Sequence, residues 1–235
     1  IGALATNFMN TLGLGWQLKI AIMIIPTLIY GFMFFKAIFP KSENIDTDTS
    51  NNIKSLFTVL FIFIAVCMTL TATTELGTQQ WLQPLLEKSG ANPMLILAMT
   101  TGIMAVGRYF AGPIVHKLNP IGVLFMSAIV STVAIYFMSV ADGTALYGAA
   151  ILFAFGVCYF WPTMIGFVAE YIPKTGALGM SLVGGMGMFA TGIWNPIIGS
   201  WIDTNTKTAI ESGLSQDLAE VAAGKATLAN MTYFP

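Results

Sequence analysis

Residues 57–81 read FTVLFIFIAVCMTLTATTELGTQQW. The first part of this stretch is continuously apolar, and a helix needs roughly 20 mostly apolar residues to cross the hydrocarbon core of a bilayer. The last third is polar and places Glu75 among threonines. We therefore expect a membrane-spanning helix from about Leu56 to Leu76 that carries polar groups near one end.

The composition of the whole chain agrees with a membrane environment. The chain has 235 residues, of which 56% are hydrophobic and 9% are charged, whereas soluble domains usually contain about 25% charged residues. A net charge of −1 gives no electrostatic support for nucleic-acid binding. Cys67 and Cys158 both lie in apolar runs, so we interpret them as small core residues and not as a disulfide or a metal pair.

Five further segments are long and apolar enough for membrane spans. They are about Ile20–Phe39, Met94–Ala111, Ile121–Val140, Leu146–Val168 and Ala177–Ile202. Strands are not expected, because a membrane barrel would show segments of about ten residues with strict alternation. The predicted fold class is therefore all-α integral membrane with six transmembrane helices.

A polar stretch, KSENIDTDTSNN, is the one clear linker and is expected to be solvated. It suggests three parts: residues 1–39 with one span, a cytoplasmic linker at 40–55, and residues 56–235 with five spans. Basic residues favour the side of this linker as cytoplasmic. On that side we place Lys36, Lys41, Lys54, Arg108, Lys117 and Lys174, against Lys19, Lys88, Lys207 and Lys225 on the other.

The two ends of the chain are less apolar than its middle. The first span lacks the basic flank of a signal peptide, and residues 1–18 are a mixed stretch that suggests the end of an earlier helix and its loop. The residues after Asp203 suggest either an amphipathic surface helix or a loop. We expect the chain to be a piece of a longer protein.

Glu75 is the most informative residue of the chain. An ionisable group within a span is costly and usually faces a cavity or a partner. A carboxyl group away from water is more easily protonated, so Glu75 is the candidate proton-coupling residue, in a locally irregular helix that its threonines and Gly77 suggest. The alternative is that Glu75 lies at the outer interface and is simply solvated.

Four other polar or aromatic residues are candidates for solute binding. Gln79 and Gln80 offer hydrogen bonds to hydroxyl-rich solutes, unless they only end a helix beside an interfacial Trp81. Trp161 precedes Pro162, which is expected to kink the fifth span, and aromatic residues at a kink either line a cavity or pack against lipid. Asn195 shares a face of the sixth span, at intervals of four residues, with Gly187, Thr191 and Gly199.

A candidate gate joins the third and fourth predicted spans. Gly107 and Arg108 end one helix, and Gly112 with the following proline suggests a tight turn. The alternative for Arg108 is an anchor at the cytoplasmic end of its helix. His116 is interpreted as a loop residue, and no metal spacing, nucleophile motif or phosphate loop occurs in the sequence. We expect no metal, no cofactor and no catalytic residue.

The sequence resembles the second half of a major facilitator superfamily transporter. Residues 107–113, GRYFAGP, are similar to the cytoplasmic loop motif between its eighth and ninth helices, although only His116 and Lys117 supply basic groups after the turn. The loop at 41–52 resembles the central linker of the family, and EYIPK at 170–174 its turn between helices ten and eleven. The resemblance covers almost the whole chain and implies helices six to eleven of twelve.

This resemblance implies alternating access, with a solute bound between two halves. Gln79 and Gln80 resemble a glutamine pair of sugar porters, and Trp161 falls near their tenth-helix aromatic residues. We expect a secondary transporter for a small polar solute, a sugar among the candidates, coupled to protons in a bacterial inner membrane. The alternatives are a multidrug or metabolite exporter of the same fold and, more remotely, an intramembrane enzyme.

Overall fold

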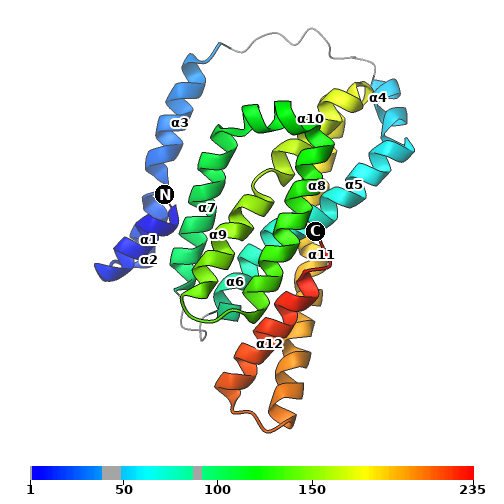
Figure 1. The fold of residues 1–235 in the computed structure, drawn as a ribbon. Helices are drawn as coiled ribbons and strands as arrows, with labels where there is room; N and C mark the ends of the chain where they lie inside the picture. Colours follow the sequence, from blue (N-terminus) through cyan, green and yellow to red (C-terminus); the bar gives the residue numbers. More distant parts are fainter. Residues whose placement is uncertain (1, 39–48, 87–91) are drawn as a thin grey trace. The chain divides into compact units, whose positions relative to one another are not determined.

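The computed structural model describes residues 2–38, 49–86 and 92–235 (Figure 1), and these residues form helices and turns without any strand. The chain divides into two compact units, Ile1–Ile45 and Asp46–Pro235. Residues 2–38 of the smaller unit form three helices. They are α1 (Gly2–Thr11), α2 (Trp16–Ala21) and α3 (Ile24–Lys36).

The larger unit contains the remaining helices. In chain order they are α4 (Thr49–Leu56), α5 (Val59–Ala72), the π-helical turn η1 (Thr73–Gly77), α6 (Thr78–Leu86), α7 (Pro93–Tyr109), α8 (Ala111–Val140), α9 (Ala145–Val157), α10 (Phe160–Tyr171), the 3-10 turn η2 (Pro173–Thr175), α11 (Gly176–Glu211) and α12 (Gln216–Met231). Helix α9 packs against both α7 and α8, and α11 packs against α5 and α12.

Within the described residues, five helical segments are long and apolar enough to cross a membrane. They are Trp16–Lys36, Val59–Leu82, Lys117–Val140, Ala145–Tyr171 and Pro173–Glu211. The third of the six predicted spans corresponds to α7, which is a shorter apolar helix of 17 residues, at the lower limit of about 17 to 25 residues for a span. The chain is thus helical and fits a multi-pass membrane protein.

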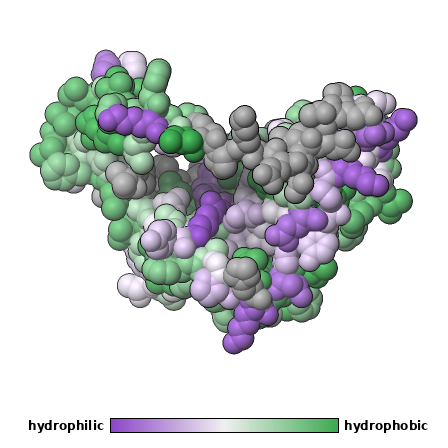
Figure 2. Space-filling view, turned by 90° about the horizontal axis from the view of Figure 1, so that it is seen from above, coloured by the Kyte–Doolittle hydropathy of each residue, from purple (hydrophilic) through white to green (hydrophobic). Residues whose placement is uncertain are grey.

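The larger unit has an apolar core, but it also exposes many large apolar side chains and buries several polar ones. Large apolar residues such as Phe63, Phe125 and Phe189 are more than 60% exposed, whereas Thr73 and Thr78 are fully buried. The face seen in Figure 2 carries both hydrophilic and hydrophobic residues on its surface. Such an arrangement is stable when lipid, and not water, covers the apolar surface.

The contact between α8 and α9 depends on a glycine. A Cβ atom at Gly156 would lie 2.6 Å from the backbone nitrogen of Ser131 and 2.7 Å from its Cα atom. Because backbone atoms cannot move aside as a flexible side chain can, the two helices approach this closely only with glycine at position 156. Small residues serve this purpose at many helix contacts in membranes.

Gly156→Ala is therefore expected to lower the free energy of unfolding by about 1–3 kcal/mol, the usual cost of overpacking. Gly148→Ala, on the same helix, is the matched control, because no atom lies within 4 Å of a Cβ there. Denaturant titration of both variants in mixed micelles measures the difference. Equal stability of the two variants would show that α8 and α9 do not meet at Gly156.

The residues after Asp203 form the end of α11 and the helix α12, which pack together. The sequence had suggested either a surface helix or a loop. Helix α11 continues to Glu211, and α12 returns along it and also packs on α8 and α6. Phe234 then packs between Trp194 and Trp201, with ring centroids 4.7 Å and 6.2 Å away. The end of the chain is thus held by aromatic contacts that span about 40 residues.

The predicted linker lies partly outside the described residues, which exclude positions 39–48. Its last residues are not a loop, because they form α4. Helix α4 packs on η2, and the Asn52 side chain lies against Gly176, 3.4 Å from the position of a Cβ there. This tertiary contact favours helix in a segment whose composition is that of a solvated linker.

Candidate functional site

The polar end of the α5 span has an irregular backbone, as its sequence predicted. Thr73–Gly77 form a π-helical turn between α5 and α6. Two threonine hydroxyls donate to carbonyl oxygens one turn earlier, Thr73 to Thr69 at 2.7 Å and Thr74 to Leu70 at 2.9 Å. Such bonds satisfy buried hydroxyls within the helix, and π-helical turns of this kind occur frequently at functional sites.

Glu75 lies in this turn and is paired with Arg108. The Arg108 Nη2 atom donates to Glu75 Oε1 at 3.0 Å, and the two side chains are 38% and 6% exposed. Glu75 is therefore buried against a partner and is not a solvated residue of an interface. Arg108 belongs to the last turn of α7, and its pairing with Glu75 was not predicted from the sequence.

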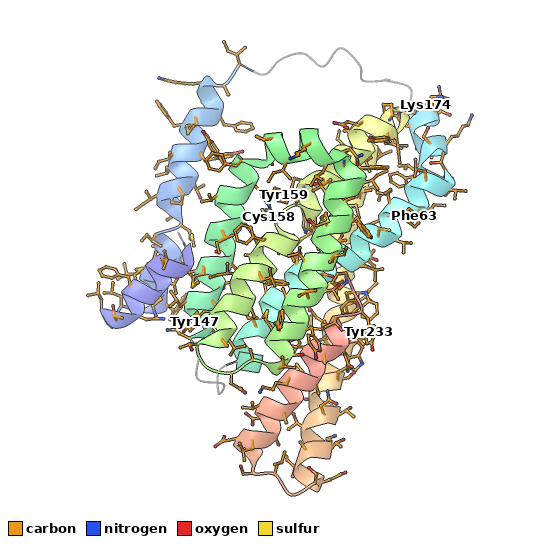
Figure 3. All side chains as sticks on the ribbon, viewed as in Figure 1. Phe63, Tyr147, Cys158, Tyr159, Lys174 and Tyr233 are labelled. Carbon is orange, nitrogen blue, oxygen red and sulfur yellow. The ribbon has the colours of Figure 1, made fainter. Side chains whose placement is uncertain are left out.

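The fifth predicted span is interrupted close to Pro162, where a kink was expected. Helix α9 ends at Val157 and α10 begins at Phe160, so the break falls at Cys158 and Tyr159 (Figure 3). Proline has no backbone N–H and its ring conflicts with the carbonyl group four residues earlier. The kink thus divides one membrane-spanning segment into α9 and α10, and it starts at the carbonyl group that Pro162 cannot bond.

The end of α7 lies directly against this break. The Arg108 Nε atom donates to the carbonyl oxygen of Cys158 at 2.8 Å, and the Tyr159 hydroxyl donates to the carbonyl oxygen of Gly107 at 3.0 Å. A Cβ atom at Gly107 would lie 2.7 Å from Cys158 Sγ. Gly107 therefore allows close contact between α7 and the break, and two of the three gating candidates, Gly107 and Arg108, contact this break.

The third gating candidate, Gly112, lies in the first turn of α8. The prediction of a tight turn there is wrong. Residues 111–118 are helical and form the first segment of α8. Pro113 is the third residue of that helix, a position in the first turn where a missing N–H costs little. The non-helical residue is Asn119, with φ 56° and ψ 165°, and its side chain accepts from Gly122 N at 2.9 Å, so it caps the second segment.

The two predicted glutamines point to different helices. Gln80 Oε1 accepts from Asn195 Nδ2 at 2.8 Å, whereas Gln79 Nε2 lies 3.4 Å from the sulfur atom of Met104 on α7. Adjacent residues of an α-helix lie about 100° apart around its axis, so this divergence follows from their sequence positions. The structure thus joins Gln80 with Asn195 and separates Gln79 from them.

Two tryptophans pack against the predicted small face of α11. A Cβ atom at Gly187 would lie 2.9 Å from the Trp161 ring, and one at Gly199 would lie 3.5 Å from the Trp81 ring. Together with the bond from Asn195, these contacts place three of the four residues of that face against α5, α6 or α10. The fourth, Thr191, donates its hydroxyl to its own helix at Met188.

Several buried polar atoms in this region have no hydrogen-bond partner among the described residues. They are Glu75 Oε2, Thr78 Oγ1, Trp81 Nε1, Trp161 Nε1 and Asn195 Oδ1. An unpaired buried polar group costs about 1–3 kcal/mol, so such a group in a folded protein needs an explanation. These atoms offer both donors and acceptors, which is what a polar ligand requires. Thr78 was not among the residues predicted from the sequence, and an interfacial position was one alternative for Trp81.

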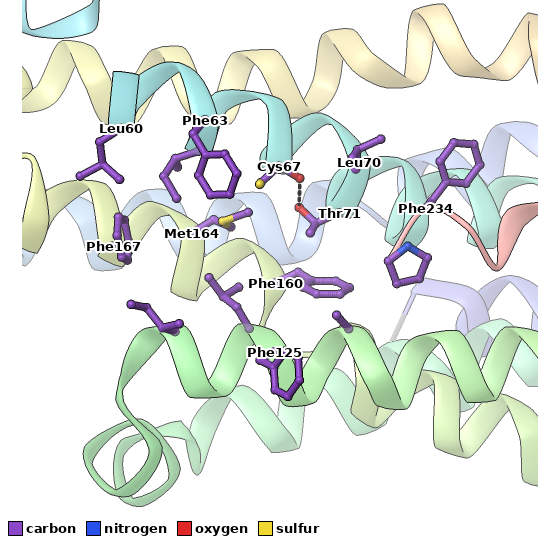
Figure 4. Close-up of a pocket in the computed structure, with 15 residues that line it drawn as sticks. Leu60, Phe63, Cys67, Leu70, Thr71, Phe125, Phe160, Met164, Phe167 and Phe234 are labelled. Atoms are coloured by element: carbon purple, nitrogen blue, oxygen red, sulfur yellow. Dashed lines mark hydrogen bonds between the residues drawn. The ribbon is translucent and has the colours of Figure 1, made fainter. Parts of the chain in front are cut away.

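A separate cavity of about 440 Å³ lies between α5, α8 and α10 (Figure 4). Its wall is almost entirely apolar and includes Phe63, Phe125 and Phe160. The Thr71 hydroxyl on this wall is already bonded to the carbonyl oxygen of Cys67 at 3.0 Å. The cavity therefore suits an apolar occupant and not a hydroxyl-rich one.

Among the described side chains, no group of three or more His, Cys, Asp and Glu residues could hold a metal ion. The side chain of His116 lies outside the described part of the chain. In comparisons with known proteins, no family model, no curated protein and no solved structure matches the chain.

Proposed function

We propose that the protein is a secondary active transporter of the major facilitator superfamily that moves a small polar solute by alternating access. The observation that carries this proposal is the Glu75 carboxylate, 6% exposed, in a π-helical turn of a membrane-spanning helix and paired with Arg108. Charged groups at such depth usually belong to a substrate, ion or proton pathway. Proton coupling through Glu75 is part of the proposal.

Protonation of Glu75 would act on a contact between helices. The neutral carboxyl group loses most of its attraction for the Arg108 guanidinium, and Arg108 also holds the carbonyl oxygen at the α9–α10 break. A proton on Glu75 would thus loosen α7 from η1 and leave it attached to the α9–α10 break. Two arrangements of one element, selected by a local charge, are the basis of many switches.

The solute would bind beside this pair, at Gln80, Asn195 and Trp161, with Gln79 on the side of α7. Unpaired donors and acceptors in this region favour a hydroxyl-rich solute, and a sugar is one candidate. The proposal is for a transporter and not an enzyme, because intramembrane catalysis needs at least two convergent catalytic groups. Glu75 is the one buried carboxylate of the described residues.

Uptake into proteoliposomes tests the proposed function. Labelled sugars, nucleosides and small organic acids are supplied with and without an inward proton gradient. Accumulation of one class that depends on the gradient is expected. Equilibration without any effect of the gradient would remove the proton from the proposal, and no uptake under either condition would contradict import of these solutes.

Asn195→Ala is expected to raise the KM of uptake by about 2- to 10-fold with little change in the maximal rate, because it removes one or two neutral hydrogen bonds. Ser200→Ala is the matched control on the same helix, since its hydroxyl bonds within the helix, to Ile197. Initial rates over a range of solute concentrations measure both. An unchanged KM in Asn195→Ala would exclude this residue from the solute site.

The apolar cavity of Figure 4 favours a second candidate, an exporter of lipophilic compounds with the same fold. Its wall has the character expected for weakly selective binding of apolar molecules. Cells that express such an exporter should survive otherwise toxic concentrations of lipophilic cations. Failure to protect against every cation of a broad panel would count against this function.

A further inference from the structure

One carbonyl group at the α9–α10 break lacks its helical donor for a covalent reason. In a regular helix the oxygen of residue 158 would accept from the N–H of residue 162. Residue 162 is proline, which has no N–H. The next bond along the chain does form, from Thr163 N to the oxygen of Tyr159 at 3.1 Å, so the missing donor leaves the Cys158 oxygen free to accept from elsewhere.

Arg108 donates to this oxygen from one nitrogen and to the Glu75 carboxylate from another. Nε donates to Cys158 O at 2.8 Å and Nη2 donates to Glu75 Oε1 at 3.0 Å. Because the guanidinium group is planar and rigid, fixing the direction of Nε also fixes the direction of Nη2. A flexible arginine side chain is thereby held in an orientation that reaches the carboxylate.

We propose that Pro162 is a positioning residue for the Glu75–Arg108 pair, because it leaves the Cys158 carbonyl oxygen as an acceptor for Arg108. The effect on transport rests on the proposed function, whereas the effect on the arginine does not. An N–H at position 162 would donate to the same oxygen, which Arg108 Nε would then share with the helix. The bond from Arg108 would be weaker, and the guanidinium group would be held less firmly in the orientation that reaches Glu75.

A second proline shows that the position alone does not produce this arrangement. Pro26 is the third residue of α3, as Pro162 is of α10, and each is followed by a threonine. The carbonyl group four residues before Pro26 belongs to Ile22, and its oxygen accepts from Ile25 N at 3.3 Å within the same segment. Pro26→Ala is therefore a matched control that removes a proline from an equivalent helix position without exposing an arginine to competition.

The carbonyl group itself can be observed by infrared spectroscopy. The chain has two cysteines, so carbon-13 cysteine in a Cys67→Ala background labels the Cys158 carbonyl alone. In this background Arg108→Ala is expected to move the labelled band to higher wavenumber, because a charged donor is lost. After Pro162→Ala the same arginine replacement is expected to move the band much less. Equal shifts with proline and alanine at position 162 would overturn the proposal.

Replacement of Pro162 by lactic acid separates the missing N–H from the rigidity of the ring. The resulting backbone ester has no donor and no ring, so the band shift caused by Arg108→Ala should match that of the protein with proline. If it instead matches that of Pro162→Ala, the ring and not the missing donor positions the arginine, and the proposal fails. This variant also remains informative where Pro162→Ala does not fold.

Transport measurements test the effect of Pro162 on function. Pro162→Ala is expected to reduce gradient-driven accumulation several-fold while solute counterflow continues, and the ester variant and Pro26→Ala are expected to keep the accumulation of the unmodified protein. Unreduced accumulation in Pro162→Ala, in a protein whose accumulation depends on Glu75, would contradict positioning. If accumulation does not depend on Glu75, the proposed function fails, whereas the infrared result still decides the position of Arg108.

Discussion

Glu75→Gln is expected to abolish proton-driven accumulation of the solute and to leave counterflow intact. The amide keeps the shape of the side chain and can still accept from Arg108, but it cannot bind and release a proton. Counterflow exchanges labelled for unlabelled solute and needs no net proton movement. Proteoliposomes with an inward proton gradient measure accumulation, and preloaded proteoliposomes without a gradient measure counterflow.

The control for this replacement is Glu170→Gln. Glu170 lies near the end of α10 and is exposed, so its charge is not held against a buried partner, and we expect accumulation to remain unchanged. Accumulation that survives Glu75→Gln would exclude Glu75 as the proton carrier. Loss of both accumulation and counterflow would instead indicate that the carboxylate is needed for the fold or for solute binding.

Arg108→Ala is expected to lower the free energy of unfolding. Breaking a buried ion pair costs about 3–5 kcal/mol, and we expect a loss near the lower end of this range. Two contacts are lost at once, to Glu75 and to the carbonyl oxygen of Cys158, and a buried carboxylate remains without a counter-ion. The lower end applies because Arg108 is 38% exposed and is partly screened. Denaturant titration in mixed micelles measures this loss.

Two further variants test whether the buried charge causes this loss. Adding Glu75→Gln to Arg108→Ala removes the uncompensated charge, so the double variant is expected to be more stable than Arg108→Ala alone. Lys225→Ala breaks the exposed pair with Asp142, 2.6 Å long, and is expected to cost about 0–1 kcal/mol. A double variant no more stable than Arg108→Ala would mean that the lost stability came from packing or from the Cys158 bond.

Some features of the site can be predicted from local sequence patterns. The threonine-rich polar end of the α5 span indicated an irregular helix, and the structure has a π-helical turn there. The free carbonyl group could also have been predicted. The carbonyl group that lacks a donor lies four residues before a proline, so Pro162 identifies it as that of Cys158. Likewise, Gln79 and Gln80 could be assigned to different directions from the 100° step of a helix.

The sequence by itself determined the helical membrane character of this protein, because lipid requires long apolar runs whose backbone bonds close within each helix. Its six predicted spans overlap α3, α5, α7, α8, the α9–α10 segment and α11. Only the tertiary structure decided which polar groups meet. Arg108 reaches Glu75 across 33 residues because Gly107 lets α7 approach the break before Pro162 so closely. Contacts of this kind depend on how separate helices pack, and no periodicity within one helix contains that information.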